Sequence, residues 1–147
     1  MTRTLPASPR YETERGLRLA VQIPEAHLDE VTAAILSVCP LKHGDYDRVT
    51  YVTAPGRQRF RSLGTGRNSA TAETVEVPCT ELAVFLPEDT ALARRCIEAI
   101  YAAHPYEEPV IHVSDCLRTL HIRGMDEDNP NRFWNRPAQD WIPPDHR

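Results

Sequence analysis

A strand-and-helix pattern occurs twice in this chain, and the repetition restricts it to few folds. The stretch LAVQIPE at 19–25 is echoed by LAVFLPE at 82–88. In each copy large aliphatic residues recur at every second position, as in a half-buried strand, before a proline that suits the first turn of a helix. Apolar residues at helical spacing follow both copies. Two β-α-β units in tandem indicate the ferredoxin-like split βαβ fold, of the α+β class.

The periodicities predict a βαββαβ order with both helices on one face of an antiparallel sheet. We expect helices near 25–38 and 88–103, and strands near 17–23, 46–54, 74–86 and 110–115. Along the third of these strands the apolar residues change phase near Pro78. Because a period of two otherwise fixes the face of a strand, this change predicts a bulge.

The pattern covers residues 17–116, which we predict to be one domain between two segments of different character. Residues 1–16 are polar and aperiodic, and predict a flexible N-terminal tail. Residues 117–147 form a C-terminal extension that contains both tryptophans, Phe133 and several prolines. Such apolar anchors predict that the extension packs on something, either the same domain or a neighbouring subunit.

Composition excludes some classes of function. With 41% hydrophobic and 26% charged residues the chain is an ordinary globular one, and its net charge of −4 gives no drive toward nucleic acid. No apolar run approaches the length of a membrane span, and the N-terminus lacks the apolar core of a signal peptide. The cysteines include no C-x-x-C pair, and predict free thiols in a reducing cytoplasm; they are Cys39, Cys79, Cys96 and Cys116.

The run HPYEEP at 104–109 forms the corner between the second predicted helix and the last strand. Pro105 and Pro109 fix their own φ angles and exclude the preceding residue from the helical region. The corner is therefore stiff, and stiff polar corners are frequent binding sites. Its ligand-binding candidates are His104, Tyr106, Glu107 and Glu108. The plainer alternative is a rigid loop whose polar groups only satisfy the local backbone.

The predicted hairpin PGRQRFRSLGTGRNSA at 55–70 is rich in arginine and glycine. Arginine forks suit phosphate or carboxylate, and glycines let backbone amides approach an anion. Right-handed crossovers place this hairpin at the same end of the sheet as the HPYEEP corner. We therefore predict that a small anionic metabolite binds between them, with Arg57, Arg59 and Arg61 as candidates. The alternative is a solvated, mobile loop.

The two glutamates of the corner test this hypothesis, because carboxylates beside the site would repel an anion. We expect at least one of Glu107 and Glu108 to be held by an arginine or a backbone amide. At least one of the three candidate arginines should then remain free. Consecutive residues of an extended segment point to opposite sides, so the two glutamates should not grip one ion together.

HPYEEP, preceded by a β-α unit and by GDYDRVTY at 44–51, resembles the domain inserted into bacterial NIF-three-like proteins. That domain is similar in fold to the CutA divalent-cation-tolerance proteins and to the PII signal transducers. PII proteins use a long loop at the place of residues 55–70 for ligand and partner contacts. The resemblance covers residues 17–116, and implies a ferredoxin-like sandwich that forms a homotrimer. It implies no established reaction.

No metal site is carried over from these proteins. The metal ligands of the NIF-three-like proteins belong to flanking domains, and no motif of CutA-like copper binding is matched. The favoured hypothesis is therefore a small cytoplasmic, trimeric module that binds a ligand or regulates, without enzymatic activity, cofactor, nucleic acid or membrane. The rival is a metal-binding protein or metal-dependent enzyme, in which a divalent metal is held by His104 and Glu107 or Glu108.

Overall fold

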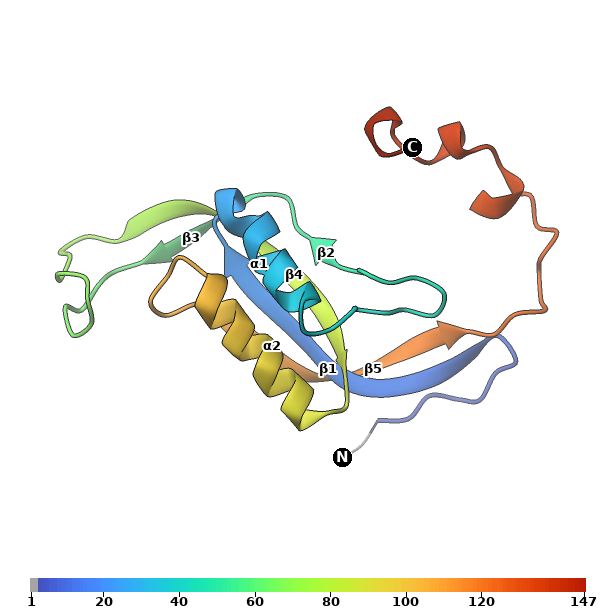
Figure 1. Ribbon diagram of the computed structural model, residues 1–147, viewed down its shortest axis with the longest axis horizontal. Coiled ribbons are helices and arrows are strands. Elements are labelled where there is room, and N and C mark those ends of the chain that lie inside the picture. The colour runs from blue at the N-terminus through green and yellow to red at the C-terminus, as the bar shows by residue number, and fades with distance from the viewer. Residues whose placement is uncertain (1–2) are drawn as a thin grey trace.

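The computed structural model, which describes residues 3–147, has one five-stranded antiparallel sheet in the order β2-β4-β1-β5, with β3 pairing β4 beyond this path. Its strands are β1 Tyr11–Ile23, β2 Tyr51–Val52, β3 Gly56–Phe60, β4 Val75–Pro87 and β5 Ile111–His121. The helices α1 Leu28–Leu36, which follows the short turn Glu25–His27, and α2 Thr90–Ala103 lie side by side on one face of the sheet (Figure 1). The predicted fold class is confirmed.

The core lies between the central strands and the two helices. Leu19 of β1 pairs with Val84 of β4, and both side chains are buried. The alternate positions of these strands and one face of each helix complete the cluster, which contains Val21, Ile23, Val31, Ile35, Leu82, Leu86, Cys96 and Ile100. This burial of aliphatic surface is the main stabilising contribution to the fold. α2 begins where Asp89 accepts a hydrogen bond from the Leu92 amide at 3.1 Å.

Two strands are longer than predicted: β1 begins earlier in the chain, and β5 ends later. β1 begins at Tyr11, so the predicted flexible tail is wrong from that residue onward, and β5 continues to His121. These extensions pair with each other, Tyr11 opposite His121. They lie beyond the part of the sheet that the helices cover, where no alternation of apolar residues is needed.

The prediction of a strand over 46–54 is largely wrong, because only Tyr51–Val52 is a strand. Leu41 and Arg48 adopt positive φ angles of 54° and 55°, which a strand does not allow. Leu41 is nevertheless buried, and anchors the loop between α1 and β2 in the core. The β-branched residues that suggested a strand lie mostly at the surface.

The hairpin predicted at 55–70 is partly a strand, since β3 pairs with the first half of β4. Four residue steps separate Val52 from Gly56, whereas three separate their partners Leu82 and Cys79. The extra residue expected for a bulge therefore lies in the partner segment and not in β4 itself. On β4 the change of phase falls at Cys79 and Thr80, which are both buried. We call β3 and its partner residues 75–79 the ribbon, and residues 61–74 its tip.

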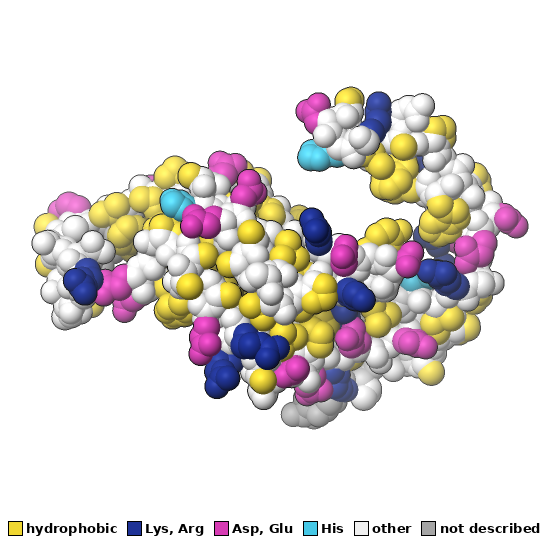
Figure 2. Space-filling model, in the orientation of Figure 1, with side chains coloured by type: hydrophobic (Ala, Val, Ile, Leu, Met, Phe, Trp, Pro, Cys, Tyr) yellow, Lys and Arg dark blue, Asp and Glu magenta, His cyan; other side chains and the backbone are white. Residues whose placement is uncertain are grey.

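Residues 122–147, which we call the C-terminal arm, leave the sheet and form three short 3-10 turns, Phe133–Asn135, Ala138–Asp140 and Pro144–His146. Phe133 stacks on Trp141 with ring centroids 4.8 Å apart, and the two side chains are 49% and 44% exposed. Figure 2 shows hydrophobic side chains on this arm, which stands apart from the body across a hollow. Packing of these aromatic residues on the chain's own domain is therefore not observed within residues 3–147.

The base of the arm is held by Asp126. Its carboxylate accepts hydrogen bonds from Asn129 at 3.0 Å and Arg132 at 2.8 Å, and lies 3.7 Å from Arg10. The hydrogen bonds from Asn129 and Arg132 hold the pKa of Asp126 below its usual value.

All four cysteines are free thiols, as predicted. Burial raises the pKa of Cys96 to about 11, so this thiol stays protonated and unreactive. Among the helices of residues 3–147, none has both the length and the apolar character needed to cross a lipid bilayer.

Candidate functional site

His104 is a structural residue of the HPYEEP corner. Its side chain is 7% exposed, and its Nε2 lies 2.7 Å from the carbonyl oxygen of Gln22. Its Nδ1 accepts a hydrogen bond from the Tyr106 amide at 3.1 Å. The two partners assign the neutral tautomer with the proton on Nε2. His104 therefore cannot bind a metal ion or act as a base without losing one of these bonds, which weakens the rival hypothesis.

Tyr106 lies against this histidine, with ring centroids 4.9 Å apart and the planes tilted by 57°. Burial raises the pKa of the Tyr106 phenol, and the neighbouring Cys79 thiol raises it further. The phenol thus stays neutral, and it lies near Cys79, the residue at which the pairing of β4 with β3 ends.

Glu107 joins the corner to the ribbon tip. Its Oε2 accepts a hydrogen bond from the backbone amide of Arg67 at 3.0 Å. A Cβ atom on Gly66 would lie only 3.0 Å from the same oxygen, so the absence of a side chain there permits the close approach. The corner and the arginine-rich segment are therefore in contact, and one glutamate is held by a backbone amide as expected. Glu108 is exposed.

The candidate arginines are distributed along β3 and just beyond it. Arg57 makes an ion pair with Glu76 at 2.9 Å, although the strand register places Glu76 opposite Arg59. Arg59 and Arg61 are exposed, and no carboxylate lies within ion-pair distance of either in residues 3–147. Two of the three candidates thus retain an uncompensated positive charge.

The described residues contain no group of three His, Cys, Asp or Glu side chains arranged to hold a metal ion. Glu107 contacts the Arg67 amide whereas Glu108 is exposed, and residues 105–108 form bends where an extended segment was expected. The geometry of the corner therefore offers positioning groups and charge, but no paired acid and base.

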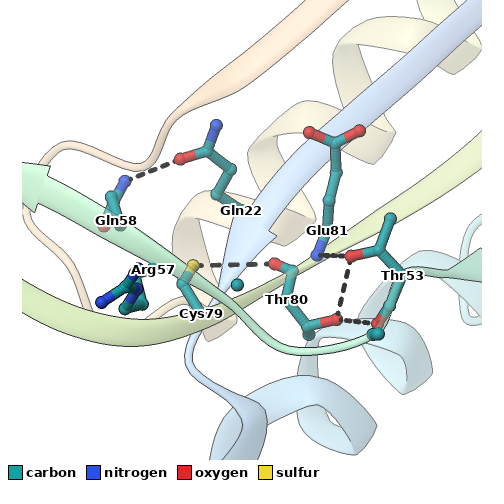
Figure 3. A pocket seen from close by; sticks show the side chains of 9 residues that line it. Gln22, Thr53, Arg57, Gln58, Cys79, Thr80 and Glu81 are labelled. Carbon is teal, nitrogen blue, oxygen red and sulfur yellow. Dashed lines mark hydrogen bonds between the residues drawn. The ribbon is translucent and has the colours of Figure 1, made fainter.

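A cavity of about 250 Å³, which the sequence did not reveal, lies where β1 ends beside the ribbon (Figure 3). Its walls present both polar and apolar surface, and come from Gln22, Thr53, Ala54, Gly56, Arg57, Gln58, Cys79, Thr80 and Glu81. The available signals in the sequence were the change of phase near Pro78 and the polar Gln22 inside the predicted strand at 17–23. Gln22 also binds His104, so this cavity and the HPYEEP corner share a wall.

A wider groove of about 800 Å³ separates the body from the C-terminal arm. It is bounded by the end of the β1–β5 pair at which Arg10 and His121 lie, the loop after α1 and the base of the arm. An ion pair between Arg123 and Asp45 at 3.6 Å crosses it, but both side chains are largely exposed. Surface ion pairs of this kind contribute little to stability.

No family model matches the sequence, and no curated protein matches it significantly. A Bacillus cereus protein related to NIF3 shares its structure with a TM-score of 0.60 at 23% identity, over 76% of this chain and 28% of that protein. The divalent ion tolerance protein CutA1 from Ehrlichia chaffeensis matches with a TM-score of 0.50 at 13% identity, over 71% of this chain and 82% of that protein. CutA from Xylella fastidiosa matches with a TM-score of 0.50 at 10% identity, over 67% of this chain and 80% of that protein.

These likenesses establish the fold alone, because all three identities are low. The chain has a ferredoxin-like fold similar to that of CutA, and it corresponds in structure to about a quarter of the NIF3-related protein. The fold expected from the HPYEEP resemblance is thereby confirmed.

Proposed function

We propose that this chain is a small, non-enzymatic regulatory module that binds an anionic metabolite between the ribbon tip and the HPYEEP corner. The hydrogen bond from the Arg67 amide to Glu107 carries the proposal, because it brings the two segments together. The same bond reduces the repulsion that a free carboxylate would exert on an anion. Binding thus requires no cofactor, and a phosphate-bearing compound is the favoured ligand.

The distribution of charge supports an anion. Arg59 and Arg61 are unpaired within the described residues, while Arg57 is engaged with Glu76. Guanidinium groups form paired hydrogen bonds with phosphate and carboxylate oxygens. Opposite them, the proline-stiffened corner needs little further ordering when a ligand binds, which lowers the entropic cost.

Replacing Arg59 and Arg61 together with alanine should abolish binding of phosphate compounds in isothermal titration calorimetry. Both side chains are exposed and unpaired, so the melting temperature should change by less than about 2 °C. The matched control is Arg94→Ala with Arg95→Ala on α2, which removes the same charge at a distance from the ribbon. If the intact protein binds no phosphorylated metabolite, or the ribbon variant binds as well as the control, the proposal is wrong.

We also propose that the module is a cytoplasmic homotrimer. Four unpaired cysteines fit a reducing compartment. Within residues 3–147, β5 has no partner on its outer side, and such an edge is usually paired or covered. The exposed aromatic residues of the C-terminal arm are not covered by the described part of their own domain, and a neighbouring subunit is the partner that we propose for them.

Truncation after His121 tests this assembly. If the arm reaches a neighbouring subunit, a chain of residues 1–121 should lose the trimer that light scattering detects for the full chain at micromolar concentration. The sheet should remain folded by circular dichroism, since the core lies between residues 19 and 100. A full chain that is monomeric at this concentration contradicts the trimer, and a truncated chain that remains trimeric contradicts the role of the arm.

A further inference from the structure

The ribbon tip is closed on itself by local hydrogen bonds. The Thr71 amide donates to the Ser62 carbonyl oxygen at 3.0 Å, and the Ser62 amide donates to the Thr71 hydroxyl at 3.0 Å. The Ser62 hydroxyl donates to the carbonyl oxygen of Asn68 and accepts from the Gly64 amide, both at 3.2 Å. These bonds fix the internal shape of the tip, but they do not fix its position on the molecule.

One polar contact joins the tip to the body. Among the described residues, the bond from the Arg67 amide to Glu107 Oε2 is the only hydrogen bond or ion pair between the tip and any residue outside the ribbon. The side chains of residues 63–70 are all exposed, so no buried apolar anchor supplements this bond. Figure 1 shows the ribbon extending beyond the helices, with its tip at one end of the molecule. The position of the tip therefore depends on Glu107.

The junction between the tip and the ribbon allows the tip to turn. The last pair of the ribbon is Phe60 with Val75, and the next cross-strand bonds join Ser62 to Thr71. Only residue 61 lies between these two points on one side, whereas residues 72–74 lie between them on the other. Residues 72–74 belong to neither strand, and short irregular segments of this kind commonly act as hinges.

The contact itself is weak enough to open. Glu107 and Arg67 are both exposed, and an exposed hydrogen bond to a carboxylate shifts an equilibrium by roughly fivefold. Gly66 permits the contact, because a Cβ atom there would lie 3.0 Å from Oε2 and 3.4 Å from Oε1 of the carboxylate. A bond of this strength favours the attached tip without making the attachment permanent.

We propose that Glu107 is a latch that holds the tip in its anion-binding position, so that release of the tip dismantles the anion site. This inference rests on the proposed function, and adds a mode of regulation to it. Arg61 belongs to the tip, so its position relative to the corner changes when the tip leaves. An anion that contacts both segments favours the latched state, and the latched state binds the anion more tightly. Glu107 is thus a positioning residue.

The sign of the effect distinguishes a latch from simple electrostatics. Removing a carboxylate that acts only by repulsion strengthens the binding of an anion. Removing a latch weakens it, because the apparent affinity falls with the fraction of tips in the binding position. Glu107→Ala removes the latch, whereas Glu107→Gln keeps an oxygen that accepts from the Arg67 amide. Glu108→Ala is the matched control, since it removes the same charge from an exposed neighbour.

Backbone ¹⁵N relaxation and relaxation dispersion of the full chain without ligand measure the latch directly. The amides of residues 63–70 should remain ordered in Glu107→Gln and Glu108→Ala, and should become mobile in Glu107→Ala. The melting temperature should be nearly unchanged in all three variants, because the tip lies outside the core. If the tip moves equally in Glu107→Ala and the intact chain, the bond does not hold it and the latch is wrong.

Titration with inorganic phosphate, followed through the same amide signals, tests the coupling. Glu107→Ala should weaken phosphate binding about fivefold, whereas Glu107→Gln and Glu108→Ala should bind at least as tightly as the intact chain. Tighter binding by Glu107→Ala contradicts the latch. An intact chain that binds no phosphate overturns the proposed function and the coupling, while the relaxation measurement still decides whether the tip is latched.

Gly66→Ala gives a second way to loosen the same contact. Its Cβ atom should push the flexible end of Glu107 aside, and should weaken phosphate binding less than Glu107→Ala does. In a chain that already carries Glu107→Ala, the same substitution should have no further effect on tip mobility or on phosphate binding. Additive effects of the two substitutions would show that Gly66 acts independently of Glu107, and would contradict the proposal.

Discussion

Replacing His104 with alanine should destabilise the protein by about 3 kcal/mol and lower its melting temperature by roughly 10 °C. The substitution removes both hydrogen bonds of a side chain that is 7% exposed. It leaves the carbonyl oxygen of Gln22 and the amide of Tyr106 without these partners, next to a space the size of an imidazole ring. Thermal unfolding followed by circular dichroism measures the effect.

The matched control is His112→Ala, which removes an exposed histidine from β5 and should change stability by less than about 0.5 kcal/mol. This comparison separates the packing of His104 from any general effect of losing a histidine. A melting temperature of His104→Ala within 2 °C of the control would mean that the corner is not held through this side chain.

Gly16→Ala should cost about 3 kcal/mol or more, and should lower the melting temperature by at least 10 °C. A Cβ atom at this position would overlap the carbonyl oxygen of Leu86 and the ring of Phe85. Gly16 pairs with Pro87 on one side and Cys116 on the other, so the central strand cannot move aside without breaking both pairings.

The same glycine explains why the Phe85 ring can lie across β1. The guanidinium of Arg118 covers this ring at 3.8 Å, and binds Glu14 at 2.7 Å and the carbonyl oxygen of Lys42 at 3.0 Å. Displacing the ring would therefore also disturb the contact between β5 and the loop after α1.

Gly56→Ala is the control for Gly16→Ala, because the nearest atom to its added Cβ would be 3.7 Å away, an ordinary contact. Both glycines lie in strands, so the intrinsic effect of adding a methyl group is shared. A Gly16→Ala protein as stable as Gly56→Ala would show that β1 and β4 can separate locally at low cost.

Local patterns in the sequence were sufficient for the central β-α units. Apolar residues alternate at 19–23 and 82–86, and recur at helical spacing after each proline. These patterns define which face of each element is apolar, and burying the faces against one another leaves few arrangements. The stiffness of the HPYEEP corner also followed from local chemistry, since proline restricts its own backbone and that of the residue before it. Each of these features depends on residues close together in the chain.

Tertiary structure decided what depends on partners far away in the sequence. Residues 11–16 became a strand because β5 pairs with them, and Tyr51–Val52 remained so short because Arg48 adopts a left-handed conformation just before it. The register of β3 against β4 decides three further features. It determines which glutamate meets the ribbon, which arginine is neutralised, and which polar atom of Gln58 is left without a partner. The sequence alone therefore determined the apolar faces and the stiff corner, whereas the site arose from contacts between segments forty or more residues apart, such as Arg67 and Glu107. Local propensity does not encode such contacts, because their geometry exists only after the strands have paired.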